Sequence, residues 1–308
     1  MIITNTARNI VNFLRNCNAR NLSLKTISTY EERLVHFNKY LLKKNIIDVE
    51  KISVPLLEEY FGEYCKKYSP TTVRGKYIVL RAFFNYLVEY GVLDISPLRV
   101  LKSPKYPKRF VKAFTREEVA ELLSMYDKET FTGCRNYTIN LVLFSTGMRR
   151  SELINVCIVD IEKDYSSIHV IGKGDKERYI PISDNLGKVL RHYMKIRKAH
   201  LIKHRYCESP ALFISAWGKP LTATGINTIF QNMKKCKKRW STKVSAHTWR
   251  HTFAKMFLLN GGDVFTLQKI LGHEDVSTTR IYVDLNRSEI EMQNRKYNPL
   301  DNSRWKYY

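Results

Sequence analysis

Six side chains in the C-terminal two thirds of the chain have the chemistry for phosphoryl transfer. They stand in five short motifs, in the order TGMRRSEL, IGKGDKER, AHTWRHTFA, LGHEDVS and TTRIYVD. The set comprises two arginines, a lysine, two histidines and a tyrosine: Arg149, Lys173, His247, Arg250, His273 and Tyr282. A tyrosine hydroxyl is a nucleophile, and the other five side chains are donors for phosphate oxygens. The set predicts covalent attack on a nucleic-acid phosphodiester, with no carboxylate cluster to hold a metal.

Two of these motifs place paired side chains at the expected start of a helix. Arg149 and Glu152 are three residues apart and so share one helix face. An arginine beside the exposed N–H groups of a helix start favours an oxyanion, and Glu152 is suited to orient that arginine. His247 and Arg250 have the same spacing, after Ser245 as a predicted N-cap. Each pair alone is most often an ordinary surface pair, but five motifs in this order point to a common site.

The composition is that of a protein that binds a polyanion. The 308 residues include 52 lysines and arginines against 29 acidic residues, a formal net charge of +23 spread over both halves. This excess predicts a nucleic-acid partner. We expect no membrane partner, because the sequence has neither a long basic amphipathic helix nor an apolar stretch that could span a bilayer. Six scattered cysteines and a first segment unlike a secretory signal predict a cytoplasmic protein with reduced thiols.

The first 96 residues carry the apolar periodicity of amphipathic helices. Helix signals are found over residues 6–16, 23–43, 53–64 and 69–91. Ser69 and Pro70, for example, are suited to the N-cap and the first helical position. Residues 1–96 therefore predict a bundle of four or five helices. Residues 97–112, with three prolines among basic residues, predict an extended basic linker.

A second domain is expected over residues 113–284, with a tail over residues 285–308. Thr115 and Glu118 match a capping box that opens its first helix. Most of this domain has helical periodicity. Three short segments between residues 156 and 183 are instead rich in β-branched residues, namely VCIVDI, SSIHVIG and ERYIPIS. They predict a small antiparallel sheet in a mainly α fold, with GKGDK in the turn between the last two segments.

The chain resembles the phage-integrase family of tyrosine recombinases, and its layout is closest to the compact Xer-like members. The resemblance covers nearly the entire chain and rests on TGMRRSEL, VIGKGDKERYIPI, SAHTWRHTFA and LGHEDVSTTRIY. It implies a SAM-like core DNA-binding domain in the N-terminal bundle, followed by a mixed α/β catalytic domain. The chain departs from the usual pattern at Arg150, Ala246 and Trp249, and none of these removes a functional group.

The resemblance also implies a role for each of the six side chains. Tyr282 would attack the scissile phosphate and form a 3′-phosphotyrosyl bond, while Lys173 would protonate the leaving 5′ oxygen. The other four would bind the phosphate oxygens or assist proton transfer: Arg149, Arg250, His247 and His273. No metal and no cofactor would be needed, because fixed cations neutralise the phosphate and the phosphotyrosyl bond conserves the energy of the phosphodiester.

The implied function is site-specific DNA recombination through a Holliday junction, in integration, excision or resolution. The partner would be double-stranded DNA with specific recombination sites, bound by a homotetramer on two sites, with accessory proteins as an open question. The tail over residues 285–308 would dock on a neighbouring protomer. The candidate DNA contacts are basic residues of the bundle and the linker: Arg74, Lys76, Arg81, Lys105, Lys108 and Arg109.

Two other functions fit the same sequence. A type IB topoisomerase-like enzyme would relax supercoiled DNA with the same residues and without a specific site. A DNA-binding regulator would keep the fold without the reaction, although the complete set of six groups argues against it. The sequence leaves open the target site and the biological outcome, because base readout depends on side-chain geometry.

Overall fold

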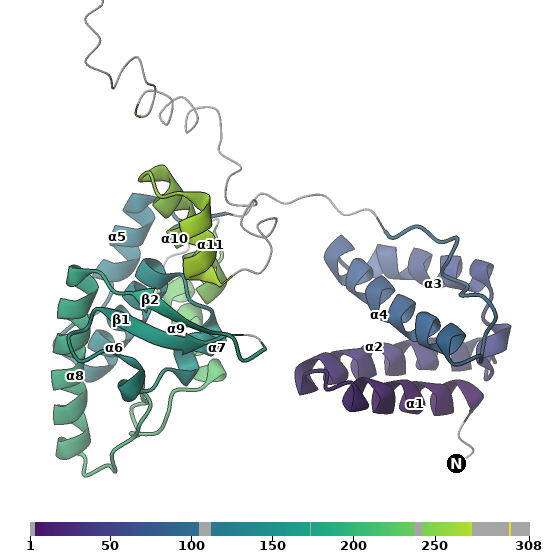
Figure 1. Cartoon of the computed structure of the whole chain (residues 1–308), viewed down its shortest axis with the longest axis horizontal. Helices are drawn as coiled ribbons and strands as arrows, with labels where there is room; N and C mark the ends of the chain where they lie inside the picture. Colours follow the sequence, from purple (N-terminus) through teal and green to yellow (C-terminus); the bar gives the residue numbers. More distant parts are fainter. Residues whose placement is uncertain (1–3, 105–111, 173, 237–241, 273–295, 297–308) are drawn as a thin grey trace, which may run out of the picture. The chain divides into compact units, whose positions relative to one another are not determined.

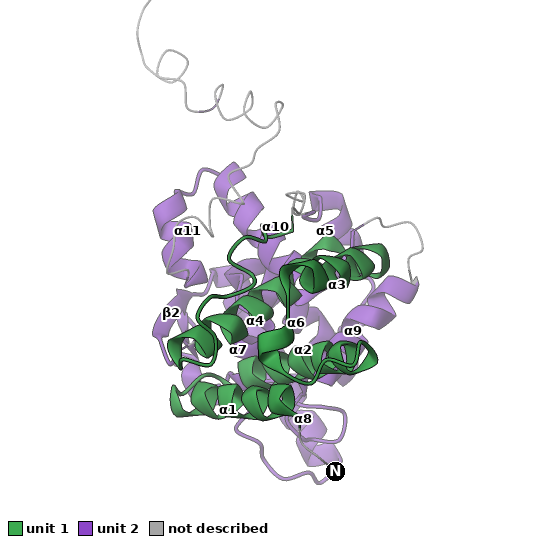
Figure 2. Ribbon diagram, turned by 90° about the vertical axis from the view of Figure 1, so that its right-hand side faces the viewer, with its two compact units in different colours: residues 1–109 green, residues 110–308 purple. Residues whose placement is uncertain are grey.

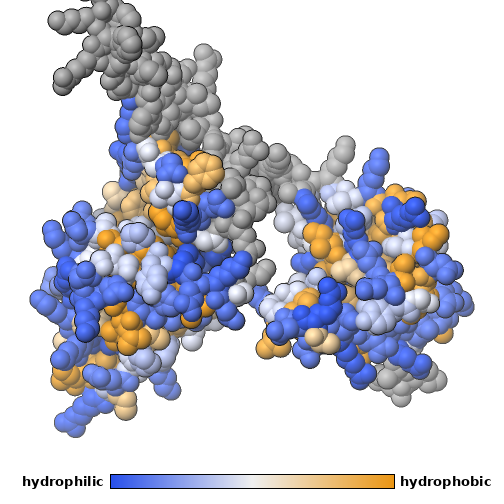
Figure 3. All heavy atoms as spheres, in the orientation of Figure 1, coloured by the Kyte–Doolittle hydropathy of each residue, from blue (hydrophilic) through white to orange (hydrophobic). Residues whose placement is uncertain are grey.

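The structure is a computed structural model that describes residues 4–104, 112–172, 174–236, 242–272 and 296. It divides into two compact units, Met1–Arg109 and Phe110–Tyr308, which Figure 2 shows in different colours. Each unit has an apolar core of its own. On the faces visible in Figure 3, hydrophilic residues cover much of both units, in keeping with the strongly basic composition. Among the described helices, none combines the length and the apolar character that crossing a membrane requires.

Over its described residues, 4–104, the first unit is built from four α-helices, in agreement with the predicted bundle (Figure 1). In chain order they are α1 (Asn5–Ala19), α2 (Leu24–Lys43), α3 (Val54–Lys67) and α4 (Pro70–Glu89), with a 3₁₀ turn, η1 (Val49–Lys51), before α3. The predicted helix starts are confirmed at Ser23 and Ser69, whose side chains accept hydrogen bonds from backbone N–H groups of the first turn. Pro70 occupies the first position of α4, where its missing N–H costs nothing.

Aromatic rings fill the core of this bundle. The ring centroids of Phe37 and Tyr60 lie 5.0 Å apart in an edge-to-face contact, and Phe13 and Phe83 form a similar pair at 5.6 Å. These rings come from all four helices, so their packing fixes the helices relative to one another. The bundle therefore has the packed core of an independent folding unit.

Lys76 lies inside this core, which corrects the prediction that it contacts DNA. Lys76 is only 6% exposed, and its ammonium group donates hydrogen bonds to the hydroxyls of Tyr60 and Tyr64. The prediction failed because helix periodicity at residue 76 does not reveal that two tyrosine hydroxyls of α3 provide buried acceptors. Of the other predicted contacts in the bundle, Arg81 is exposed and Arg74 is partly exposed.

The second unit is mainly helical, around a central helix α6. Its α-helices are α5 (Arg116–Ser124), α6 (Phe131–Thr146), α7 (Arg150–Asn155), α8 (Asp184–Lys203), α9 (Ala223–Cys236), α10 (Ala246–Leu259) and α11 (Val264–Leu271). The capping box predicted at Thr115 is confirmed, with Glu118 as its second member. Helix α6 packs against α5, α8 and α10, so it joins the two sides of the unit (Figure 1).

The sheet has two strands rather than three within the described part of the chain. Strands β1 (Ser167–Ile171) and β2 (Glu177–Pro181) pair antiparallel, with Ile171 opposite Glu177 beside the turn. The segment VCIVDI instead contains a 3₁₀ turn, η2 (Ile158–Asp160), and joins its neighbours only by isolated bridges. The carboxylate of Asp160 accepts a hydrogen bond from the N–H of Cys157 at 2.7 Å, which curls the backbone away from an extended strand. β-branched residues alone therefore gave the wrong prediction for this segment.

The buried Lys76 predicts a distinctive dependence of stability on pH. Burial lowers the pKa of Lys76 to about 8, so its charged form destabilises the folded state below that pH. We expect the wild-type melting temperature to rise relative to that of Lys76→Met between about pH 8 and about pH 10.5, where the folded state has lost the proton of Lys76 and the unfolded chain still holds it. Tyr64, whose pKa is raised to about 12, keeps its proton over this range. Thermal unfolding of both proteins at several pH values tests this. As a control, Lys66→Met, on the exposed side of α3, should show no such trend. A difference in melting temperature between wild type and Lys76→Met that stays constant with pH would contradict the prediction.

Candidate active site

The first arginine of the site is held in place by a buried carboxylate. Arg149 is the N-cap of α7, and Glu152 lies three residues further along, only 4% exposed. The carboxylate accepts a hydrogen bond from the backbone N–H of Arg149 at 2.6 Å and another from its Nη1 at 2.7 Å. The structure thus shows the predicted pairing of the two side chains. About a third of the Arg149 side chain remains exposed, so the guanidinium is accessible from one side.

A second guanidinium, which the sequence analysis missed, completes the surroundings of Glu152. Arg178 of β2 donates from Nη1 and Nη2 to the two carboxylate oxygens, at 3.0 and 2.9 Å. This is the bidentate geometry that makes arginine–carboxylate pairs strong. Burial alone would raise the pKa of Glu152, but the bonds from Arg178 and Arg149 outweigh it and hold the pKa below its usual value. The sequence offered one signal that the Arg178 side chain points inward: it lies two residues before Ile180 on the same strand, so both share the face that is buried at Ile180.

The second arginine of the predicted set comes from α10. Arg250 is 3% exposed and donates from Nη1 to the carbonyl of Gly147 and from Nη2 to the carbonyl of Leu271, both at 2.8 Å. These carbonyls belong to the C-terminal ends of α6 and α11. Arg149 reaches the same end of α11, because its Nη2 donates to the carbonyl of Gly272 at 3.2 Å. The two arginines, which are 101 positions apart in the sequence, therefore meet at the end of α11.

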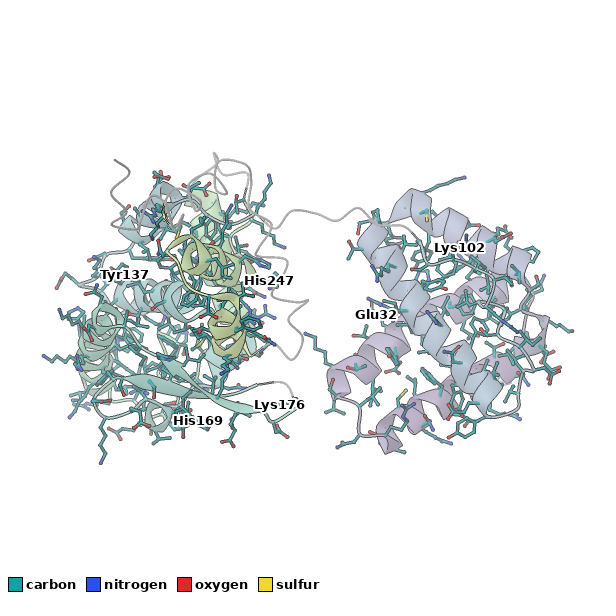
Figure 4. All side chains as sticks on the ribbon, turned by 45° about the horizontal axis from the view of Figure 1, so that its top comes forward. Glu32, Lys102, Tyr137, His169, Lys176 and His247 are labelled. Carbon is teal, nitrogen blue, oxygen red and sulfur yellow. The ribbon has the colours of Figure 1, made fainter. Side chains whose placement is uncertain are left out.

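His247 stands one turn before Arg250 on α10. The helix begins after Ser245, whose hydroxyl accepts from the N–H of Thr248, as the sequence predicted. His247 is exposed, and Figure 4 shows it on the same side of the second unit as Lys176 of the hairpin turn. Although part of the residue is exposed, partial burial of the ring and the charge of Arg250 lower the pKa of His247 below 6.5. The imidazole is therefore neutral at pH 7 and able to accept a proton.

Three predicted site residues lie outside the described residues: Lys173, His273 and Tyr282. The structure describes residues next to two of them, Lys173 and His273. The N–H of Gly172 donates to the carbonyl of Lys176 at 2.7 Å and closes the predicted turn between β1 and β2. Gly272, which precedes His273, caps α11 in the left-handed conformation. Also outside the described residues are three of the predicted DNA contacts, Lys105, Lys108 and Arg109, and the tail over residues 285–308 apart from residue 296.

The donor set of the site is cationic and suits an anionic ligand rather than a metal. Within the described ranges, no group of three or more histidine, cysteine, aspartate or glutamate side chains is arranged to hold a metal ion. Around the end of α11 the structure instead collects three guanidinium groups and one carboxylate, from Arg149, Arg178, Arg250 and Glu152. Fixed guanidinium groups are the usual protein ligands for phosphate.

Comparison with known proteins places this site in a family. The model of the phage integrase family matches residues 112–289, and that of the phage integrase N-terminal SAM-like domain matches residues 10–91. The chain belongs to the phage integrase family. The predicted family and fold class are thereby confirmed: a SAM-like helical domain precedes a mainly helical domain with a small antiparallel sheet.

Individual relatives cover almost the whole chain. Tyrosine recombinase XerC of Listeria welshimeri is 31% identical over 91% of this chain and 93% of its own length. Tyrosine recombinase XerD of Staphylococcus aureus is 30% identical over 91% of this chain and 94% of its own length. Among solved structures, XerA recombinase is 27% identical and covers 96% of this chain and 99% of its own, with a TM-score of 0.52. XerH bound to a palindromic difH substrate has a TM-score of 0.70 at 23% identity, over 94% of this chain and 88% of its own, and supports the fold alone.

Removing the negative charge of Glu152 tests how far the cluster depends on it. Glu152→Gln leaves Arg149 and Arg178 without their buried counter-charge, so we expect the free energy of unfolding to fall by about 3 kcal/mol at neutral pH. The loss should shrink as pH falls below about 4.5, because the depressed pKa of Glu152 makes its contribution disappear when it is protonated. Denaturant unfolding at several pH values measures both effects. Glu177→Gln, on the exposed side of β2, should cost less than about 1 kcal/mol; an equal cost would contradict the role of Glu152.

The pKa of His247 can be measured directly. We expect its ring to titrate below 6.5 in an NMR titration of the free protein. In Arg250→Gln the pKa should move upward, because the neighbouring positive charge that disfavours imidazolium is removed. Arg116→Gln, a change of the same kind on α5, should leave the titration of His247 where it was. A His247 pKa that is above 6.5, or that does not respond to Arg250→Gln, would show that the two side chains are not coupled as the structure has them.

Proposed function

We propose that the chain is a site-specific DNA recombinase that cuts and rejoins DNA strands through a 3′-phosphotyrosyl intermediate on Tyr282. The observation that carries the proposal is the meeting of Arg149 and Arg250 at the end of α11, with Glu152 fixing the first of them. Two guanidinium groups from separate helices, held before any substrate arrives, suit the phosphorane of phosphodiester cleavage. Membership of the phage integrase family and relatives called tyrosine recombinases support the same reaction.

In the cleavage step, the phenolic oxygen of Tyr282 attacks phosphorus and the bond from phosphorus to the 5′ oxygen breaks. The phenolic proton passes to a base, for which the neutral imidazole of His247 is suited. Lys173 donates a proton to the leaving 5′ oxygen, which becomes a hydroxyl. Arg149, Arg250 and His273 bind the non-bridging oxygens. Rejoining reverses the step, because the 5′-hydroxyl of another strand attacks the phosphotyrosyl bond and releases the tyrosine without an external energy source.

Double-stranded DNA is the partner, and the finer assembly is part of the proposal. XerH was solved with its difH substrate, which supports DNA as the ligand of this fold. The charge of +23 and the exposed Arg81 of the bundle are consistent with phosphate contacts in addition to those of the site. We propose that Arg74 and the linker residues Lys105, Lys108 and Arg109 add to them. Four protomers would act on two DNA sites through a Holliday junction, with residues 285–308 docking on a neighbour.

The alternatives are not favoured by the relatives. A type IB topoisomerase-like enzyme and a DNA-binding regulator would use the same fold, but the relatives that match most of the chain are recombinases. The proposal includes integration, excision and resolution, because relatives of the fold include both Xer recombinases and a transposon integrase.

Replacing the proposed nucleophile gives a direct test. DNA sites can be selected from a random library by binding and then tiled with single nicks, so that cleavage releases a short strand and traps the covalent intermediate. We expect the wild-type protein to form a DNA adduct that survives denaturing electrophoresis, without added divalent ions. Tyr282→Phe should form none while binding the same DNA, because only the phenolic oxygen is lost.

The control for this experiment is Tyr206→Phe, a tyrosine after α8 that should still form adducts at the wild-type rate. Mass spectrometry of the adduct should place the DNA on Tyr282. Adducts at another side chain, or cleavage that requires a divalent ion, would refute the proposal. Relaxation of any supercoiled plasmid, irrespective of its sequence, would favour the topoisomerase-like alternative.

A further inference from the structure

Three arginines from three different elements converge on three successive carbonyls. These carbonyls belong to residues 270–272, at the C-terminal end of α11, where a helix has backbone acceptors without partners of its own. Arg178 donates from Nε to the first at 2.8 Å, Arg250 from Nη2 to the second at 2.8 Å, and Arg149 from Nη2 to the third at 3.2 Å. The partial negative charge of a helix C-terminus favours this arrangement. The end of α11 is therefore fixed by the same cations that form the proposed phosphate site.

Arg178 differs from Arg149 in how its side chain is used. Its Nε donates to the carbonyl of Ile270, while Nη1 and Nη2 donate to the two oxygens of Glu152. Every nitrogen of this guanidinium thus has a partner within the protein, and the side chain is only 12% exposed. Arg149 keeps 35% of its side chain exposed. Because two of its nitrogens are bound to a buried carboxylate and the third to a helix-end carbonyl, Arg178 is placed to hold these groups.

The glycine at the end of α11 is explained by the space that the Arg178 side chain occupies, whereas Gly172 only borders that space. A Cβ atom on Gly272 would lie 3.0 Å from Nη1 and 3.1 Å from Cδ of Arg178, and the φ of Gly272 is +63°. A Cβ atom on Gly172 would lie 3.4 Å from the same Nη1 and 3.6 Å from Oε1 of Glu152. The side chain thus fits between the hairpin turn and the end of α11. A residue larger than glycine at position 272 would displace it and would also strain the backbone.

We propose that Arg178 is a positioning residue for DNA cleavage, acting through Glu152 on Arg149 and through the carbonyl of Ile270 on the end of α11. The inference rests on the proposed function and deepens it. Arg178 connects β2, the N-terminus of α7 and the C-terminus of α11. These are the elements next to which the sequence carries Lys173, Arg149 and His273. A single side chain thereby links the chain segments that supply three of the proposed active groups.

Lysine cannot replace arginine in this position. Arg178 makes hydrogen bonds in two directions: a parallel pair to the carboxylate of Glu152 and one bond to the carbonyl of Ile270 at the end of α11. A planar guanidinium provides this geometry, whereas an ammonium group is a single point of donors on a flexible stem. Arg178→Lys keeps the charge that balances Glu152 but loses the link to α11 or the bidentate pair. It therefore separates the effect of geometry from that of charge.

The test compares DNA binding with the rate of adduct formation at saturating protein, on the nicked substrates described above. For Arg178→Met we expect the single-turnover rate constant to fall about 100-fold, while the dissociation constant for DNA changes less than about threefold, because small misplacements of catalytic groups slow chemistry far more than binding. Arg178→Lys should lose about tenfold or more. The matched control is Arg191→Met on α8, whose guanidinium also donates to a backbone carbonyl, at 2.6 Å; it should keep the wild-type rate.

A double-mutant cycle distinguishes positioning through Glu152 from general damage. If Arg178 acts through Glu152, the variant that combines Arg178→Met with Glu152→Gln should be no slower than the slower single variant. Rate losses that multiply would overturn this route. Hydrogen exchange of the free proteins adds a measurement that does not depend on activity: Arg178→Met should exchange faster at α11 and unchanged at α1 to α4. The double variant removes both charges of the Arg178–Glu152 pair, so it leaves neither of these two residues charged without its partner. It can therefore be measured even if Arg178→Met folds poorly.

Failure of the inference and failure of the proposed function give different results. A wild-type protein that forms adducts, together with an Arg178→Met variant that forms them equally fast, would overturn the inference alone. The inference alone would also be overturned if the slower adduct formation of Arg178→Met were fully accounted for by weaker DNA binding or by a smaller amount of folded protein. A wild-type protein that forms no adduct on any bound site would overturn the proposed function, and the inference with it.

Discussion

The site depends on one buried negative charge. Glu152 accepts hydrogen bonds from the backbone N–H and Nη1 of Arg149 and from two nitrogens of Arg178, so that its carboxylate is surrounded by donors although water is almost excluded. A buried carboxylate without these partners would be costly, and the arginines without it would repel one another. Arg250 reaches the end of α11 that Arg149 also contacts, so three guanidinium groups and one carboxylate gather there. Within the described residues, the guanidinium groups at the end of α11 therefore outnumber the carboxylates that contact them, which suits an anionic ligand.

Residues without functional groups decide where these charges stand. Gly147 ends α6 with a φ of +61°, and a Cβ atom there would lie 2.4 Å from the ring of Phe253 and 2.7 Å from Cδ2 of Leu271. The glycine thus lets the end of α6 approach α10 and α11 closely, and its carbonyl accepts a hydrogen bond from Arg250. Two residues later, Arg149 caps α7. The motif TGMRRSEL thus forms a tight turn that brings together the end of α6, the start of α7 and the end of α11. This turn places Arg149 within hydrogen-bonding distance of the end of α11.

Local signals in the sequence predicted the parts of the fold that depend on neighbouring residues. The N-caps at Ser23, Ser69 and Ser245 and the pairing of Arg149 with Glu152 need only residues within one helical turn. Features that depend on distant partners were missed. Lys76 finds its acceptors on another helix, and Arg178 joins Glu152 across 26 positions in sequence. The segment at residues 156–161 was wrongly predicted as a strand because a side-chain contact, rather than β propensity, decides its backbone.

The burial of the arginines bears on how fixed cations would act in the proposed phosphoryl transfer. A cation in water must shed or reorient its hydration when charge develops on a phosphate, whereas a cation fixed in a folded site has already lost most of that water. Arg250 and Arg178 are both largely buried and are oriented by carbonyl and carboxylate oxygens. The cost of desolvating them is therefore offset when the chain folds, by the packing of the apolar core of the second unit, and is not repeated when DNA is cleaved. Because helix-end carbonyls are weaker partners for a guanidinium than a phosphate is, the same contacts that orient the arginines in the free protein can yield to the substrate.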